Sequence, residues 1–282
     1  MSDDEKLFIG FIEGLVDYAP RDYDEGFGTV YERYVMGKYL RDLKKRFNIE
    51  SVFEGPSDGI TGIRGINSYP FADEGCEVTY YTPSKREEEY TKTAWNLISP
   101  ESSVNIKTGN PLSFPFEDDS FDLSWNFCIL EHLKNPVVLA SEMVRVSKRY
   151  VLFMTQNVFN IGTFPHVIYH LLYRKPWDHG MLRWMSLGGI KKIVSNLDLN
   201  ILEEGVIDVP PWPDTWDMPV RGFFKRGMES IGESWNWSTL TSLAKDSKPS
   251  PLIRRVELFE KLPLPTTLKL PFAHHLYVLC EK

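Results

Sequence analysis

The chain has 282 residues, 42% of them hydrophobic and 25% charged, a composition that is ordinary for a globular protein with a full core. Its formal net charge of −7 argues against nucleic-acid binding, and its apolar runs are shorter than the about 20 residues of a transmembrane segment. The acidic first residues and the three widely spaced cysteines predict a cytoplasmic protein with reduced thiols.

Strands and helices alternate along most of the chain, after a helical cap expected over residues 1–48. In this cap, apolar residues around 8–16 predict a short helix, and Met36, Leu40, Leu43 and Phe47 recur at helical spacing in a second one. Alternation of this kind predicts parallel strand pairing. The expected strands are 49–54, 77–81, 103–108, 121–126, 150–156, 200–209 and 274–280, with helices clearest at 84–97 and 136–146.

Two aromatic-rich segments interrupt the pattern after the fifth and sixth expected strands. The first covers 157–185, inside a core expected over 49–209, and the second covers 210–271, before a final core strand in 272–282. The second is too long for a plain loop, so we expect a lid or subdomain. The alternatives are an extension of the core or a dimer interface, so a homodimer stays open. The aromatic side chains expected to wall a pocket for an organic acceptor are Tyr169, Trp177, Trp184 and Trp212.

Residues 114–133, with the sequence FPFEDDSFDLSWNFCILEHL, are the most informative stretch. A polar turn precedes a short apolar strand, Asn126 stands where this strand ends, and a helical pattern follows. An open α/β sheet presents a ligand crevice in this way. The stretch resembles the "LPF-x-D-x-SFD…EHL" wording of class I S-adenosylmethionine-dependent methyltransferases. The resemblance implies a Rossmann-like, mainly parallel seven-stranded sheet in the order 3-2-1-4-5-7-6, with an antiparallel last strand.

The same resemblance implies a cofactor site for S-adenosylmethionine, beginning at the end of the first strand. The family has an acid and then a glycine-rich turn there, and the matching stretch here is VFEGPSDGITG, residues 52–62. Pro56 stands about where the first glycine usually lies, and its fixed φ and missing N–H change the geometry of the turn. A simple strand-to-helix turn is the alternative. The residues implied at this part of the site are Glu54, Gly55, Ser57, Asp58 and Gly59.

The next two strands show further departures from the family pattern. Thr82 replaces the acid that usually binds both ribose hydroxyls, and a hydroxyl lacks the bidentate bonding of a carboxylate. Glu87 is a candidate substitute, although an exposed helix face is its expected place. After the third strand, Asn110 replaces the acid that receives the adenine amino group. The resemblance places Pro111 and Leu112 beside the adenine, and Asn126 and Phe127 at the methionine end.

Methyl transfer needs an aligned nucleophile more than a catalytic apparatus, and it needs a base only if the nucleophile is protonated. His132 is the candidate base, with a helix-start histidine bonded to backbone as the alternative. His166 and His170 are four residues apart and are followed by Asp178 and His179. A metal site is one interpretation of this group, but no glutamate completes a known ligand spacing, so the sequence assigns no metal. The other interpretation is that these histidines are acceptor-site bases on a lid.

Three classes of function follow from these observations. The first is S-adenosylmethionine-dependent methylation of a small or medium organic acceptor, including a lipid-like one. The second is a degenerate relative that binds the cofactor weakly or not at all and acts as a partner or regulatory subunit. Pro56 and Thr82 favour this class and the next one. The third is an enzyme of this fold with a different nucleotide ligand. The fold alone does not decide between them.

Overall fold

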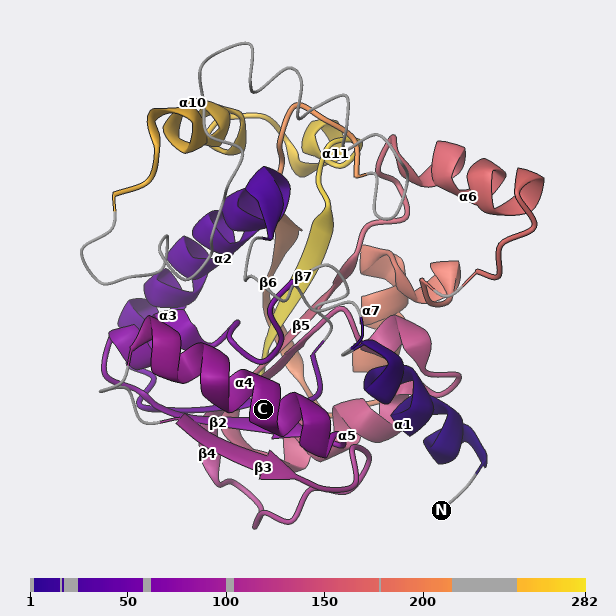
Figure 1. Ribbon diagram of the computed structural model, residues 1–282. Coiled ribbons are helices and arrows are strands. Elements are labelled where there is room, and N and C mark those ends of the chain that lie inside the picture. The colour runs from indigo at the N-terminus through magenta and orange to yellow at the C-terminus, as the bar shows by residue number, and fades with distance from the viewer. Residues whose placement is uncertain are drawn as a thin grey trace.

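The computed structural model of the chain describes residues 3–15, 17, 25–57, 62–99, 104–177, 179–214 and 248–282. A seven-stranded sheet with the order β3-β2-β1-β4-β5-β7-β6 forms its centre (Figure 1). This is the predicted fold class, with the predicted strand order. The strands are β1 (Ser51–Glu54), β2 (Glu77–Thr82), β3 (Val104–Thr108), β4 (Phe121–Phe127), β5 (Ser147–Gln156), β6 (Asn200–Ile207) and β7 (His275–Glu281).

Strand pairing is parallel from β3 to β5 and antiparallel at β7. β1 lies between β2 and β4, with Glu54 opposite Tyr80 on one side and Trp125 on the other. β7 runs antiparallel to both of its neighbours, and His275 pairs with Gln156 of β5 and Ile207 of β6. The prediction of an antiparallel last strand inside the sheet is therefore confirmed.

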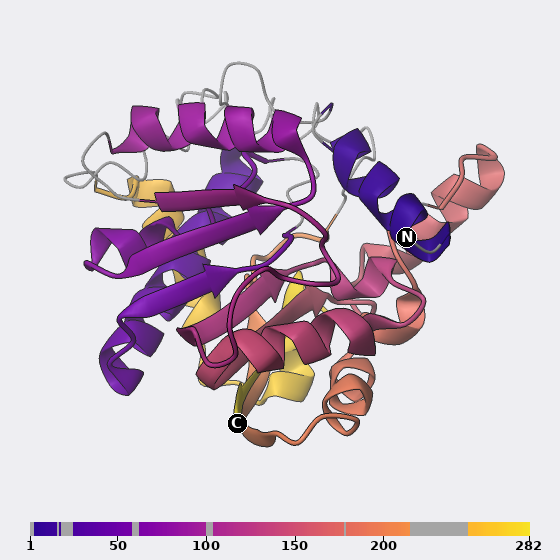
Figure 2. The ribbon, with the colours of Figure 1, turned by 90° about the horizontal axis from the view of Figure 1, so that it is seen from below.

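Hydrophobic cores lie on both faces of the sheet, as the period-2 alternation of strands requires. In β5, Leu152 and Met154 belong to one core, whereas Val151 and Phe153 belong to the other. Helices α2 (Gly26–Phe47), α3 (Tyr69–Asp73), α4 (Lys85–Ile98) and α10 (Pro251–Glu260) contribute to the first core, and α1 (Asp3–Leu15), α5 (Pro136–Val146) and α7 (Leu187–Val194) to the second. Figure 2 shows α2 and α5 on opposite sides of the sheet.

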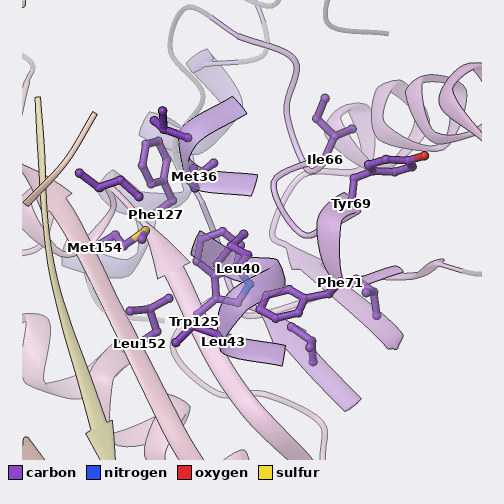
Figure 3. Packing of buried hydrophobic residues seen from close by; sticks show 14 of the residues in the cluster. Met36, Leu40, Leu43, Ile66, Tyr69, Phe71, Trp125, Phe127, Leu152 and Met154 are labelled. Carbon is purple, nitrogen blue, oxygen red and sulfur yellow. The ribbon is translucent and has the colours of Figure 1, made fainter. Parts of the chain in front are cut away.

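The first core fixes the position of α2 against the strands. Its side chains Met36, Leu40 and Leu43 point towards Trp125 of β4 and Leu152 of β5 (Figure 3). All five are at most 3% exposed. At about 25 cal/mol per Å² of apolar surface, burial of such side chains supplies most of the free energy that holds α2 in place.

Serine side chains cap the starts of two helices. The Ser84 hydroxyl accepts a hydrogen bond from the Glu87 N–H at the start of α4, and Ser186 accepts one from Gly189 at the start of α7. These bonds satisfy backbone donors that would otherwise lack a partner at a helix start.

The two segments expected as insertions meet at the end of the molecule to which β5 runs. Helix α6 (Thr163–Leu172) follows β5, and α10 and α11 (Thr266–Lys269) precede β7; all three lie at this end (Figure 1). The Asn160 side chain joins the segments, because its Nδ2 donates to Ala273 O at 3.0 Å and its Oδ1 accepts from Asp214 N at 3.0 Å. Among the described helices, none combines the length and the apolar character needed to cross a membrane.

Candidate active site

Glu54 occupies the carboxyl end of β1 and is fully buried. Its carboxylate accepts from Asn67 Nδ2 at 3.2 Å and from the Ser68 N–H at 3.0 Å. Burial raises the pKa of this carboxyl above its ordinary value, while the hydrogen bonds from Ser68, Ser57 and Asn67 oppose the shift. Protein donors thus hold the acid in a defined orientation at the crevice.

A second buried acid lies behind Glu54 and connects the site to α2. Asn67 accepts through Oδ1 from Arg33 Nη1 at 2.5 Å, and the same guanidinium pairs with Glu25 at 2.6 Å. Arg33 also donates to Ile63 O at 2.6 Å. Buried polar side chains therefore bind the backbone of the described residues just before α3 and fix their position.

Hydrogen bonds hold the described start of the turn after β1 against β4. Gly55 N–H donates to Trp125 O at 2.9 Å, and the Ser57 hydroxyl donates to Gly55 O at 3.4 Å. Asp58 and Gly59, which the resemblance implied at the cofactor, lie outside the described residues. In the described part of this connection no α-helix begins before Tyr69.

Thr82 ends β2 where the family has an acid, and its side chain is fully buried. Its Oγ1 accepts from the Ser84 N–H at 3.1 Å. The hydroxyl is therefore already bonded to its own loop, and it retains one donor for another group.

Glu87 is not on an exposed helix face, and that expectation was wrong. Its carboxylate is fully buried, because the first turn of α4 packs against β2 and the chain around Arg64. Oε2 lies 3.2 Å from Arg64 Nε, and the Tyr80 hydroxyl donates to Oε1. Arg64 Nη2 also donates to Ser57 O at 2.7 Å, so one buried guanidinium joins the turn after β1 to α4.

The sequence reasoning missed Arg64 altogether. The available signal was a single basic residue among Ile63, Gly65 and Ile66, in a stretch otherwise suited to burial. A charge in such a place predicts a buried partner, because an unpaired buried ion is costly.

Asn110 follows β3 and is exposed, with its Oδ1 accepting from the Leu112 N–H at 2.9 Å. This is an Asx turn, which orders the loop. Pro111 is buried, whereas Leu112 is half-buried against the core of α1 and α5. An amide oxygen has two lone pairs, so the Asx turn by itself does not prevent a bond to a ligand.

Asn126 near the end of β4 is the clearest anomaly. It is fully buried, yet neither Oδ1 nor Nδ2 has a hydrogen-bond partner among the described residues. Thr155 of β5 has the same property at Oγ1 and lies on the same face, because Asn126 pairs with Phe153 and alternate residues share a face. Cys128, two residues later, has a positive φ of 49°. Unsatisfied buried groups next to a strained backbone are typical of a ligand site.

Phe127 is directed to the opposite face from Asn126. It belongs to the core of α2, and its ring lies 4.8 Å from that of His275. The structure therefore separates these two predicted neighbours, and only Asn126 lies on the face that α1 and α5 cover.

His132 lies in a single 3-10 turn, η2 (Leu130–His132), after β4. Its ring stacks on Phe11 of α1, with 4.1 Å between centroids. Burial, followed by the charges of His179 and Arg64, lowers its pKa to about 3. The ring is therefore neutral near pH 7.

Glu131 beside it is fully buried and connects three segments. Its Oε1 accepts from Gln156 N–H at 3.1 Å, and its backbone O accepts from Met181 N–H at 2.7 Å. Glu131 thus orients this turn relative to β5 and to the segment after α6.

The four aromatic residues expected around one pocket are divided between different places. Tyr169 and Trp177 lie 6.4 and 5.7 Å, between ring centroids, from His166. Trp184 packs on the core of α5 and α7, while Trp212 packs on the opposite core, 5.6 Å from Phe27. Their role in acceptor binding stays a prediction.

A further charged pair, which the sequence analysis did not predict, lies where β6 ends and β7 begins. His274 Nδ1 is 2.9 Å from Asp208 Oδ2. Burial opposes the charge on His274, but Asp208 and Asp214 outweigh it and raise the pKa to about 10. Burial lowers the pKa of the adjacent His275 to about 4, so the neighbours carry different charges at neutral pH. The His-His pair at the strand start was the available signal.

Comparison with known proteins finds a matching family model and solved structures of the same fold. Residues 61–154 match a family model described as a methyltransferase domain. A magnesium protoporphyrin IX methyltransferase from Synechocystis PCC 6803, solved with bound SAH, is 11% identical over 90% of this chain and 84% of its own, with a TM-score of 0.51. A Galdieria sulphuraria protein provisionally assigned as a sarcosine dimethylglycine methyltransferase is 13% identical, over 87% and 84%, with a TM-score of 0.52.

The fold also occurs with another activity. The [4+2]-cyclase SpnF is 13% identical over 87% of this chain and 80% of its own, with a TM-score of 0.51. At these identities the structural likeness establishes the fold alone, so activity has to be argued from the site.

Proposed function

We propose that this chain is a class I S-adenosylmethionine-dependent methyltransferase, which binds S-adenosylmethionine across the carboxyl ends of β1 to β4 and methylates a small or medium organic acceptor. The residues fit this cofactor in part. Glu54, Asn110 and Asn126 supply polar groups at three of the four strand ends, and Thr82 supplies a hydroxyl in place of the acid.

Asn126 is the observation that carries the proposal. A buried amide without partners costs about 1–3 kcal/mol per unsatisfied group, and chains rarely retain that cost without a reason. Its position between the ends of β1 and β5 is the expected place for the methionine part of the cofactor. The amide offers two donors and an oxygen acceptor, which match an ammonium and a carboxylate.

The cofactor supplies an electrophilic methyl group, and the chain's own residues provide position and dryness. Phe11 covers the ring of His132, and Phe8 and Ile12 of the same helix are buried in the core beside it. This arrangement excludes water from the segment after β4. Because the pKa of His132 is about 3, the ring can accept a proton but is a weak base. That favours an acceptor whose nucleophile arrives already deprotonated.

The acceptor is proposed to enter from the end where α6, α10 and α11 gather (Figure 1). At this end of the sheet, Asn160 bonds the segment that follows β5 to Asp214 and to Ala273, which lies just before β7. A net charge of −7 makes a polyanionic acceptor unfavourable, whereas the aromatic rings of Tyr169 and Trp177 suit an organic molecule.

Calorimetric titration with S-adenosylmethionine and S-adenosylhomocysteine tests the cofactor site. Asn126→Leu should weaken binding about 10-fold or more, the worth of one or two lost hydrogen bonds. Ser124→Ala is the matched control, because Ser124 lies on the same face of β4 but donates to Met143 O at 2.7 Å. Equal affinities for the two variants would contradict the role of Asn126.

Thr82→Asp should tighten binding by about 1 kcal/mol if the ribose lies at the end of β2. The bond that Thr82 accepts from Ser84 favours the alternative, a degenerate relative acting as a partner or regulatory subunit. Two results together would favour that alternative or a different ligand in the crevice. The folded wild type would give no binding heat with S-adenosylmethionine or S-adenosylhomocysteine at millimolar concentration, and Thr82→Asp would not restore binding.

A further inference from the structure

Helix α6 buries polar histidine side chains and exposes apolar ones, the reverse of the usual arrangement. His166 and His170, four residues apart on this helix, are 0% and 5% exposed, whereas Phe164 and Leu171 are 73% and 76% exposed. His179, in the segment that returns from the helix, is also 5% exposed. Three imidazoles therefore fill an interior position that apolar residues usually occupy. Such an arrangement calls for a specific reason.

The three rings converge, and each ring directs its Nε2 atom towards the others. His166 Nε2 lies 2.9 Å from His170 Nε2, which lies 3.2 Å from His179 Nε2. In a tetrahedral zinc site with Zn–N distances of about 2.0–2.1 Å, two ligand nitrogens are about 3.3–3.4 Å apart. Movements of a few tenths of an ångström would therefore admit an ion at the centre.

The surroundings set the tautomer that a metal requires. His170 Nδ1 is 2.9 Å from Pro176 O, and since a carbonyl only accepts, Nδ1 carries the hydrogen. In the neutral ring the lone pair is then on Nε2, the atom facing the other two histidines. A ligating histidine usually donates its second N–H to a carbonyl or carboxylate in this way.

The loop that carries His179 is held close to this centre. Trp177 packs its ring 5.3 Å from that of His170 and 5.1 Å from that of His179, and its Nε1 donates to Gly180 O at 2.6 Å. The next residue, Met181, donates to Glu131 O at 2.7 Å. The histidine cluster is thus one short segment away from the turn that contains His132.

We propose that His166, His170 and His179 form a three-imidazole binding site for a divalent transition metal, with zinc as the expected ion. Imidazole nitrogen suits zinc, copper and nickel, whereas magnesium and calcium prefer oxygen ligands. The ion fastens the loop at His179 to α6, and through Met181 it fixes this end of the molecule against Glu131. Three protein ligands leave one position of a tetrahedral ion for water or another group. The site does not depend on the cofactor or on methyl transfer.

Metal binding by the full-length protein tests the site directly, without any methyl donor present. Chelator-treated protein is titrated with zinc by calorimetry, its bound metal is quantified after dialysis, and cobalt is used to record the visible spectrum of a tetrahedral site. We expect one zinc per chain and a higher Tm with zinc, because a ligand that binds only the folded state stabilises it. Absence of binding by wild-type protein at millimolar zinc would overturn the proposal.

Two variants separate this site from other histidines. His179→Gln should weaken zinc binding by more than about 100-fold, beyond the 10–100-fold cost of losing an outer partner. His275→Gln is the control, since His275 belongs to the other group of potential ligands, with Asp208 and Glu32, and should bind zinc as the wild type does. Equal loss in both variants, or none in His179→Gln, would refute the assignment. A circular dichroism spectrum of His179→Gln like that of the zinc-free wild type ensures that lost affinity reflects the ligand and not unfolding.

Discussion

The buried ion pair between Arg64 and Glu87 should be one of the most sensitive points of the fold. Arg64→Met removes the cation but leaves the Glu87 carboxylate in a site that is at most 1% exposed. Breaking a buried pair in this way costs about 3–5 kcal/mol. This loss is a large part of the unfolding free energy of a typical folded protein, which is about 5–15 kcal/mol. At about 2–4 °C per kcal/mol for a large domain, Tm should fall by roughly 10 °C.

Urea denaturation monitored by circular dichroism measures this loss in a double-mutant cycle. The cycle compares the wild type, Arg64→Met, Glu87→Gln and the double variant. Glu87→Gln keeps an acceptor for the Tyr80 hydroxyl but removes the negative charge. The double variant should lose less than the sum of the single losses by about 2–3 kcal/mol, because it leaves no uncompensated charge. Additive losses, or a loss below about 1 kcal/mol for Arg64→Met, would refute the reasoning.

Arg86 is the matched control, because it also lies on α4 but forms its ion pair in solvent. Its side chain is 59% exposed and that of its partner Asp17 is 66% exposed, at a distance of 2.7 Å. Arg86→Met should leave the unfolding curve unchanged. Arg64→Met should also weaken cofactor binding, since Arg64 holds Ser57 O at 2.7 Å in the turn after β1.

Three further predictions concern His274, Phe11 and Phe53. Because Asp208 raises the folded pKa of His274 to about 10, the charged His274 contributes stability that is complete below about pH 6.5 and is lost as the pH rises towards 10. In urea denaturation, the difference in unfolding free energy between wild type and His274→Gln should therefore shrink from about pH 6.5 to about pH 10. A difference that stays constant would contradict this prediction. Phe11→Ala should expose the ring of His132 and raise its pKa from about 3 towards 6.5, as an NMR titration would record; an unchanged value would mean that Phe11 is not what buries it. Phe53 of β1 is fully buried, and its ring lies 4.7, 5.5 and 5.2 Å from those of Phe114, Phe116 and Phe121. Phe53→Ala should cost about 3–5 kcal/mol of unfolding free energy, and a loss below about 1 kcal/mol would show that these rings repack.

The sheet could be predicted because its information is local. Strands such as Phe121–Phe127 are short apolar runs between turns, and the helix Pro136–Val146 has both helical spacing and a proline at its start. The family resemblance then supplied the order of the strands, including the antiparallel place of His275–Glu281, which no local pattern contains.

The contacts within the site could not be predicted, because they depend on residues far apart in the chain. Glu87 looked like a helix-surface residue, since its buried partner Arg64 is more than twenty positions away. His166, His170 and His179 were noted together in the sequence, but helical spacing relates only the first two, and the approach of His179 depends on the course of a loop. Trp212, expected beside Trp184, packs on the other face of the sheet.

The place of β7 between β5 and the edge strand β6 makes β6 depend on β7 for its pairing. β6 joins the sheet only through β7, with Ile207 opposite His275 and Asn200 opposite Glu281. When the ribosome has produced β6, its partner is still unmade, and Ile201 and Leu202 have no sheet to join. Docking of β6 therefore has to wait for a segment distant in sequence, a delay that slows folding and prolongs the exposure of an unpaired edge. A chain cut before His275 would for this reason lose two strands of the sheet and not one.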